Sequence, residues 1–174
     1  RYGEGGAACA REDLALTLDR AIRAVKKADW RGNRFKEREV RNAIQLQSGR
    51  IVISSMKMLA NPPRHAVLTY VSDDDGQSWT PGNLIDLGGA GHHGGVSEAT
   101  IAQLPHGPLV MLLRTNWRQF WRALSDDGIH WRDIQPSGID ASPAPALLSR
   151  LQSGRYLLLW NRLFPEGASD FPLI

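Results

Sequence analysis

The chain has 174 residues, of which 42% are hydrophobic and 22% are charged, and its formal net charge is +3 at pH 7. This length suffices for one domain with a hydrophobic core, and the near-average composition excludes wholesale disorder. Basic residues never run beyond a pair and no apolar run approaches the ~20 residues of a membrane span, so a nucleic-acid footprint and a membrane span are both excluded. The single cysteine, Cys9, excludes an internal disulfide framework and a cysteine-based zinc cluster.

The first predicted element is an amphipathic helix within residues 12–30. Acidic residues open the stretch EDLALTLDRAIRAVKKADW and two lysines stand near its end, which matches the sign of the helix dipole. Its apolar residues follow a three/four spacing: Leu14, Leu18, Ala21, Ile22, Val25 and Ala28. We therefore expect residues 1–30 to form a leader whose helix packs against a neighbour. The first ten residues lack the basic leader and long apolar stretch of a signal peptide, and a secreted or periplasmic location stays open.

From residue 31 onward, short apolar runs alternate with glycine, proline and aspartate, which predicts strands and turns. One pattern occurs three times: LQSGRIVIS begins at Leu46, LPHGPLVML at Leu104 and LQSGRYLLL at Leu151. Each copy has leucine, two residues, glycine, one residue and then an apolar strand. We expect each glycine to occupy a tight turn with a positive φ.

A second pattern alternates with the first. The stretch SDDDGQSW ends at Trp79 and SDDGIHW ends at Trp131, 52 residues later. Together the two patterns define a unit of roughly 50 residues built from short strands, which is typical of a β-propeller blade. A third copy of the acidic pattern is expected just beyond residue 174.

The first acidic stretch fits S-x-D-x-G-x-x-W and resembles the Asp-box, or bacterial neuraminidase repeat, of the sialidase superfamily. The second stretch is one residue shorter. The residues concerned are Ser72, Asp74, Gly76 and Trp79 in the first box, and Ser125, Asp127, Gly128 and Trp131 in the second. An aspartate in such a turn accepts backbone N–H groups while the tryptophan covers the turn. The resemblance implies a structural role at the blade periphery; calcium binding by Asp73, Asp74 and Asp75 is the weaker alternative, because a longer ligand series is missing.

The segment SEATIAQLPHGPLVMLLRT carries the resemblance further, over roughly residues 38–164. It is similar to the sialidase pattern of a glutamate entering a strand, a glycine turn, and a strand that ends in arginine. Glu98 and Arg114 occupy these places. The resemblance implies that Glu98 activates a tyrosine nucleophile and that Arg114 holds a substrate carboxylate through its planar charged fork. From the residues alone, we would expect Glu98 to be solvated or salt-bridged. Arg114 would then cap the water-exposed end of a buried strand.

Three further places are candidates for substrate contact. Arg41, with Asn42 as a polar neighbour, resembles an early sialidase stretch that reaches the active site. Arg162 ends the third repeat strand much as Arg114 ends the second. His93 lies in the glycine-rich stretch GGAGHHGGVSEA, where the alternative is a plain exposed loop.

The sequence therefore predicts an all-β chain: a β-propeller of the six-bladed sialidase type, of which residues 31–174 supply roughly three blades. The resemblance implies a sialidase-like glycosidase that acts on terminal sugars of glycans, including acidic ones, with a glycan as its partner and without cofactor or metal. The alternatives are a non-catalytic propeller that binds carbohydrate or protein, and another propeller enzyme such as a lyase. No residue matches the general acid, the tyrosine nucleophile is expected downstream of residue 174, and missing blades or a partner chain should close the fold.

Overall fold

The computed structural model describes residues 37–91, 94–105 and 107–162, which form ten strands and no helix. The all-β expectation is confirmed for this part of the chain. The helix expected within residues 12–30 lies outside the described residues. The search for a helix long and apolar enough to cross a membrane finds none in the described ranges.

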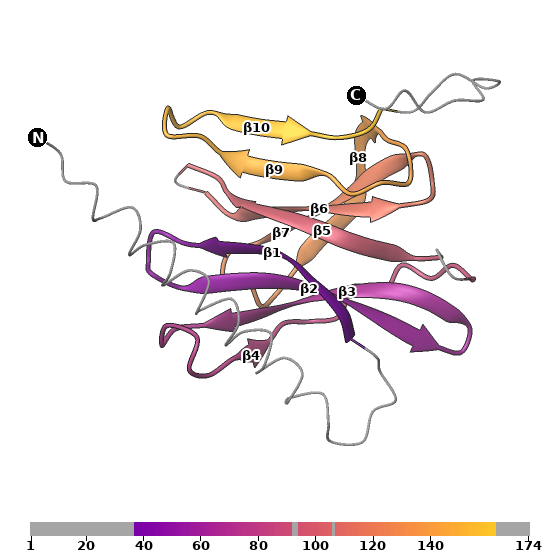
Figure 1. Ribbon diagram of the computed structural model, residues 1–174, viewed down its shortest axis with the longest axis horizontal. Helices are drawn as coiled ribbons and strands as arrows, with labels where there is room; N and C mark the ends of the chain where they lie inside the picture. Colours follow the sequence, from indigo (N-terminus) through magenta and orange to yellow (C-terminus); the bar gives the residue numbers. More distant parts are fainter. Residues whose placement is uncertain (1–36, 92–93, 106, 163–174) are drawn as a thin grey trace, which may run out of the picture.

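The strands form three antiparallel sheets that follow one another along the chain (Figure 1). The first sheet contains, in spatial order, β1 (Glu37–Gln45), β2 (Ile51–Ala60), β3 (Pro63–Ser72) and β4 (Thr80–Pro81). The second contains, in spatial order, β5 (Val96–Gln103), β6 (Leu109–Thr115), β7 (Gln119–Ser125) and β8 (Arg132–Asp140). The third contains β9 (Leu147–Arg150) and β10 (Tyr156–Leu159). Each strand therefore pairs with its neighbour in sequence, as in a meander of hairpins.

The first strands of the sheets lie next to one another, because β5 contacts both β1 and β9. The main hydrophobic core fills the space between the first and second sheets. Alternate residues of their strands supply it, as the period of two in a strand requires; among them are Val52, Val67, Val71, Ile101, Met111 and Leu113.

The three repeated turns are closed by the same pair of backbone hydrogen bonds. In the first, Leu46 N donates to Arg50 O at 2.8 Å and Gly49 N donates to Leu46 O at 2.9 Å. The bonds recur at Leu104 and at Leu151. The expected positive φ is confirmed at the first and third glycines, with 91° at Gly49 and 83° at Gly154. It is wrong for Gly107, whose turn has the same hydrogen bonds without a positive φ.

The first Asp-box is a compact turn held by its serine and aspartate. Ser72 Oγ accepts the N–H of Gly76 at 2.8 Å, and Asp74 Oδ1 accepts the N–H of Ser78 at 2.8 Å. The hydroxyl of Ser78 donates to Asp74 Oδ2 at 2.6 Å. These bonds, first of all those from Ser78, lower the pKa of Asp74 to about 2. The indole of Trp79 covers the turn and donates to Gly76 O at 3.1 Å.

The shorter second box reproduces this bonding. Ser125 Oγ accepts the N–H of Gly128 at 2.9 Å, and Asp127 Oδ1 accepts the N–H groups of Ile129 and His130, each at 2.8 Å. Burial raises the pKa of Asp127, but the hydrogen bonds from His130, Ile129 and Ser125 outweigh it and hold the pKa well below its ordinary value. The missing residue therefore shortens the turn without removing its aspartate.

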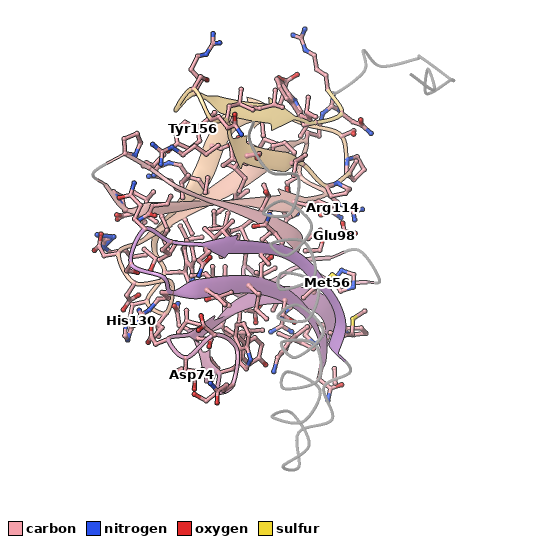
Figure 2. All side chains as sticks on the ribbon, turned by 60° about the vertical axis from the view of Figure 1, so that its left-hand side comes forward. Met56, Asp74, Glu98, Arg114, His130 and Tyr156 are labelled. Carbon is pink, nitrogen blue, oxygen red and sulfur yellow. The ribbon has the colours of Figure 1, made fainter. Side chains whose placement is uncertain are left out.

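The two boxes and the repeated turns lie at one end of the sheets, which we call the turn end. Ser72 pairs with Ile51 directly after the first turn, and Ser125 pairs with Leu109 directly after the second. Arg114 stands five residues further along β6 than Leu109, a distance of about 17 Å in an extended strand. Figure 2 shows Asp74, His130 and Tyr156 on one side of the molecule and Glu98, Arg114 and Met56 on the other.

Candidate functional site

A pocket of about 170 Å³ lies where the first strands of the three sheets meet, near the middle of β1 and β5. The first sheet contributes one amide from β1, the second contributes a glutamate from β5, and the segment entering β9 contributes an apolar wall. The lining residues are Asn42, Glu98, Ala99, Thr100, Pro145, Ala146 and Leu147. The pocket thus combines a polar corner with an apolar side, as small-molecule sites commonly do.

Glu98 reaches the pocket because β5 contains a bulge. Ser97 pairs with Arg114 and Thr100 pairs with Leu112, so Glu98 and the next residue face a single residue of β6. Glu98 has a φ of 30°, in a region that glycine favours and that a glutamate adopts only at a cost. Bulges and such backbone outliers concentrate next to functional sites, where they redirect a side chain.

Arg114 forms an ion pair with Glu98 through its Nη1, across the β5–β6 pairing. The side chains are 17% and 10% exposed, so the pair is largely shielded from water. Arg114 itself does not line the pocket. The ion pair therefore ties the carboxylate of a pocket-lining residue to a guanidinium outside the lining, which fixes the position of the carboxylate.

Asn42 links the first sheet to the second at this place. Its Oδ1 accepts the N–H of Ile101 at 3.0 Å, and Ser54 Oγ donates to Ala99 O at 3.0 Å nearby. The Asn42 Nδ2 donates no hydrogen bond to another residue in the described ranges, so this amide hydrogen-bond donor is available beside the pocket. The strand β1 also slips in register at this place, between Val40 and Asn42.

The other residues expected to touch a substrate have different outcomes. The backbone of Arg41 lies in β1 at the register slip, but its side chain lies outside the described residues, as does His93. Arg162 follows β10 and pairs with Asp140 at 3.3 Å, both exposed and neither lining the pocket. Counted from the repeated leucine, the position equivalent to Arg114 is Asn161, so Arg162 is one residue out of register with it.

Sequence reasoning missed the apolar wall of the pocket. Pro145, Ala146 and Leu147 come from a segment without a motif, more than forty residues after Glu98. Thr100 was missed as well: its hydroxyl accepts the N–H of Leu148 at 3.0 Å and so fixes the third sheet to the second. No signal in the sequence could have found these residues, because their roles depend on how successive sheets pack.

No group of three or more His, Cys, Asp or Glu side chains in the described residues is arranged to hold a metal. Two of the three aspartates proposed for calcium have protein partners: Asp73 pairs with Arg50 at 2.7 Å, and Asp74 accepts the Ser78 donors. The two tyrosines in this part of the chain do not line the pocket. Tyr156 donates to Gln103 O at 2.5 Å near the turn end, and Tyr70 lies buried in β3.

A search of curated proteins finds no match. Among solved structures, a protein of unknown function from Dyadobacter fermentans DSM 18053 matches with a TM-score of 0.55 and 24% identity, over 67% of this chain and 32% of that chain. The likeness concerns the fold alone, and this chain spans about a third of that protein. A family model described as the BNR repeat-like domain matches residues 30–168. This match confirms the resemblance to Asp-box repeat proteins, and the chain belongs to the BNR repeat-like domain family.

Proposed function

We propose that the chain is part of a six-bladed β-propeller and that the complete protein is a sialidase-like glycoside hydrolase, acting on terminal sugars of glycans, including acidic ones. In this proposal each sheet is a blade and β1, β5 and β9 are the inner strands around the propeller axis. The family membership and the order of the strands support the proposal.

The observation that carries the proposal is the position of Glu98. Glu98 lines a pocket at the junction of three sheets, forms an ion pair with Arg114, which lies outside the lining, and stands on a bulge with a positive φ. Ligand sites are commonly concave and contain a few convergent polar groups against apolar walls. A sugar ring has the matching chemistry, because hydroxyl groups surround its edge and C–H groups form its faces.

In the proposed mechanism Glu98 acts as the base that takes a proton from the nucleophile. Arg114 keeps the carboxylate in one position, and the Asn42 amide donates a hydrogen bond to a sugar oxygen. The wall formed by Pro145, Ala146 and Leu147 covers an apolar face of the ring. The nucleophile and the general acid come from other parts of the complete protein, because Glu98 is the only titratable residue of the described pocket lining.

The test is the Glu98→Gln variant of the full-length protein, assayed against fluorogenic sialosides and neutral glycosides. Glutamine keeps the size of the side chain and an oxygen for Arg114, whereas alanine would leave the largely buried guanidinium without this partner. We expect turnover of the best substrate to fall by 10²–10⁴-fold with a small change in KM. The Asp74→Asn variant in the first box is the matched control and should keep its turnover at 25 °C. Unchanged turnover in Glu98→Gln would contradict the proposal.

A non-catalytic carbohydrate-binding propeller is the second candidate. It is favoured by the single titratable group in the described pocket lining, since glycosidases generally use a pair. In that case the wild-type protein would bind a glycan and hydrolyse none of the panel, and Glu98→Gln would weaken binding. Hydrolysis of any glycoside by the wild-type protein would favour the glycoside hydrolase over the non-catalytic binding protein.

A further inference from the structure

The second Asp-box does more than close its own turn, because its tryptophan is bonded to the first sheet. The indole Nε1 of Trp131 donates to Thr69 Oγ1 at 2.8 Å as well as to Gly128 O at 3.2 Å. The Thr69 hydroxyl in turn donates to Gly128 O at 2.5 Å. Thr69 is fully buried and Trp131 almost so. Three polar groups from two sheets thus satisfy one another away from water.

Asn83, just after β4, binds the backbone of the same box. Its Oδ1 accepts the N–H of Trp131 at 2.6 Å, its Nδ2 donates to Trp131 O at 3.2 Å, and its own N–H donates to Ile129 O at 2.9 Å. The side-chain amide therefore pairs with Trp131 as a neighbouring strand would.

Gly82 permits this close approach. A Cβ at Gly82 would lie 2.6 Å from Thr69 Oγ1 and 2.8 Å from Ile129 O. Any larger residue would push the box away from the first sheet. Arg50 adds one more link, since its Nη1 donates to Asp127 O at 2.9 Å.

The first box has no such partner among the described residues. The Trp79 indole donates only to Gly76 O, within its own turn. Thr69 stands three residues before the first box and Asn83 four residues after its tryptophan, so the equivalent positions in the second sheet are Arg122 and Gln135. Neither of these two side chains makes a hydrogen bond within the described ranges.

We propose that Thr69, Gly82 and Asn83 form a socket for the Asp-box of the following sheet, and that this box and its socket form a latch between the two sheets. The latch requires a threonine three residues before a box and an asparagine four residues after its tryptophan. The sequence therefore predicts which neighbouring sheets form a latch. The first sheet binds the box of the second through Thr69 and Asn83, whereas the second sheet has Arg122 and Gln135 at these positions and should not bind a following box. This inference does not depend on the proposed function.

The test compares Asn83→Ala with its positional equivalent Gln135→Ala in the full-length protein. We expect Asn83→Ala to raise the equilibrium constant of urea unfolding about tenfold, which corresponds to about 1.4 kcal/mol, and Gln135→Ala to change it less than twofold. Hydrogen exchange of the Trp131 amide should quicken by more than the tenfold rise in global unfolding in Asn83→Ala, while exchange of the core Leu113 amide quickens by no more than that. Equal effects of the two variants, or an unchanged Trp131 amide, would overturn the proposal.

A second variant covers the case in which Asn83→Ala fails to fold. Thr69→Val keeps the shape of the side chain and removes the hydroxyl, so the Trp131 indole loses one of its two acceptors. We expect the indole N–H resonance of Trp131 to move and that of Trp79 to stay. If both resonances keep their wild-type positions, the socket is refuted.

Discussion

Adding one methyl group at Gly128 should show how tightly the second box is pressed against the first sheet. Gly128 has a φ of 77°, and a Cβ there would lie 2.9 Å from Val52 Cγ2 and 3.2 Å from Val71 Cγ1. Both valines belong to the buried core and are stiff at χ1, so they cannot rotate away cheaply. Gly49 is the matched control, because its φ is 91° and a Cβ there would meet nothing within 4 Å.

Both alanine variants lose stability because alanine disfavours a positive φ, and only Gly128→Ala also overpacks the core. An alanine with a positive φ costs about 1–2 kcal/mol in either place. Overpacking a buried site by one methyl group adds about 1–3 kcal/mol, and only Gly128→Ala incurs it. We therefore expect Gly49→Ala to lose about 1–2 kcal/mol and Gly128→Ala about 2–5 kcal/mol of the free energy of unfolding.

Urea unfolding of the full-length protein, followed by tryptophan fluorescence, measures both values if the m-values agree. The difference between the variants isolates the contact between the box and the core valines. Equal losses would contradict this expectation, because they would mean that a methyl group at Gly128 has free space around it.

Four further predictions concern the aspartates of the two boxes, one ion pair and the core. Asp74 has a folded pKa of about 2 against an ordinary value of 3.8, so its stabilising effect is complete above about pH 4 and lost as the pH falls toward 2; Asp74→Asn should flatten the stability curve over that range in an acid titration. The lowered pKa of Asp127 acts in the same direction, and Asp127→Asn should flatten the same part of the curve. Arg50→Ala removes both its partly exposed ion pair with Asp73 and its hydrogen bond to Asp127 O, and should cost about 1–3 kcal/mol, of which 0.5 M NaCl reduces only the ion-pair part in thermal melts. Met111→Ala opens a cavity in the fully buried core and should cost about 2–5 kcal/mol by urea unfolding.

The repeated turns and the Asp-boxes could be predicted from the sequence, because both depend on hydrogen bonds between residues close together in the chain. Each repeated turn is closed by a bond from the N–H of its leucine to the carbonyl oxygen four positions on, and in the boxes serine and aspartate oxygens accept N–H groups only a few residues away. These hydrogen bonds join residues only a few positions apart, so the same short sequence forms the same hydrogen-bonded turn each time it occurs. Gly107 shows the limit, because its turn closes with a different backbone conformation.

The candidate site depends on packing between sheets, and of its seven lining residues only Asn42 and Glu98 were expected from the sequence. Glu98 and Arg114 were found from a family resemblance and do form an ion pair, but the bulge that turns Glu98 toward the pocket leaves no mark in the sequence. Leu147, at the start of the third sheet, lies 49 residues after Glu98, and the rest of the apolar wall directly precedes it in the chain. Asn83 and Trp131 are 48 residues apart, so their pairing was invisible for the same reason.

We propose that ligands bind at the pocket lined by Glu98 and that the Asp-boxes are structural. The test is a titration of the isotope-labelled full-length protein with an oligosaccharide, in which the backbone amide shifts are followed by NMR. We expect the amides of Glu98, Thr100 and Leu147 to move while those of Ser78 and His130 in the boxes stay, and Glu98→Gln to suppress the shifts. Shifts confined to the boxes, or a response that survives Glu98→Gln unchanged, would contradict the proposal.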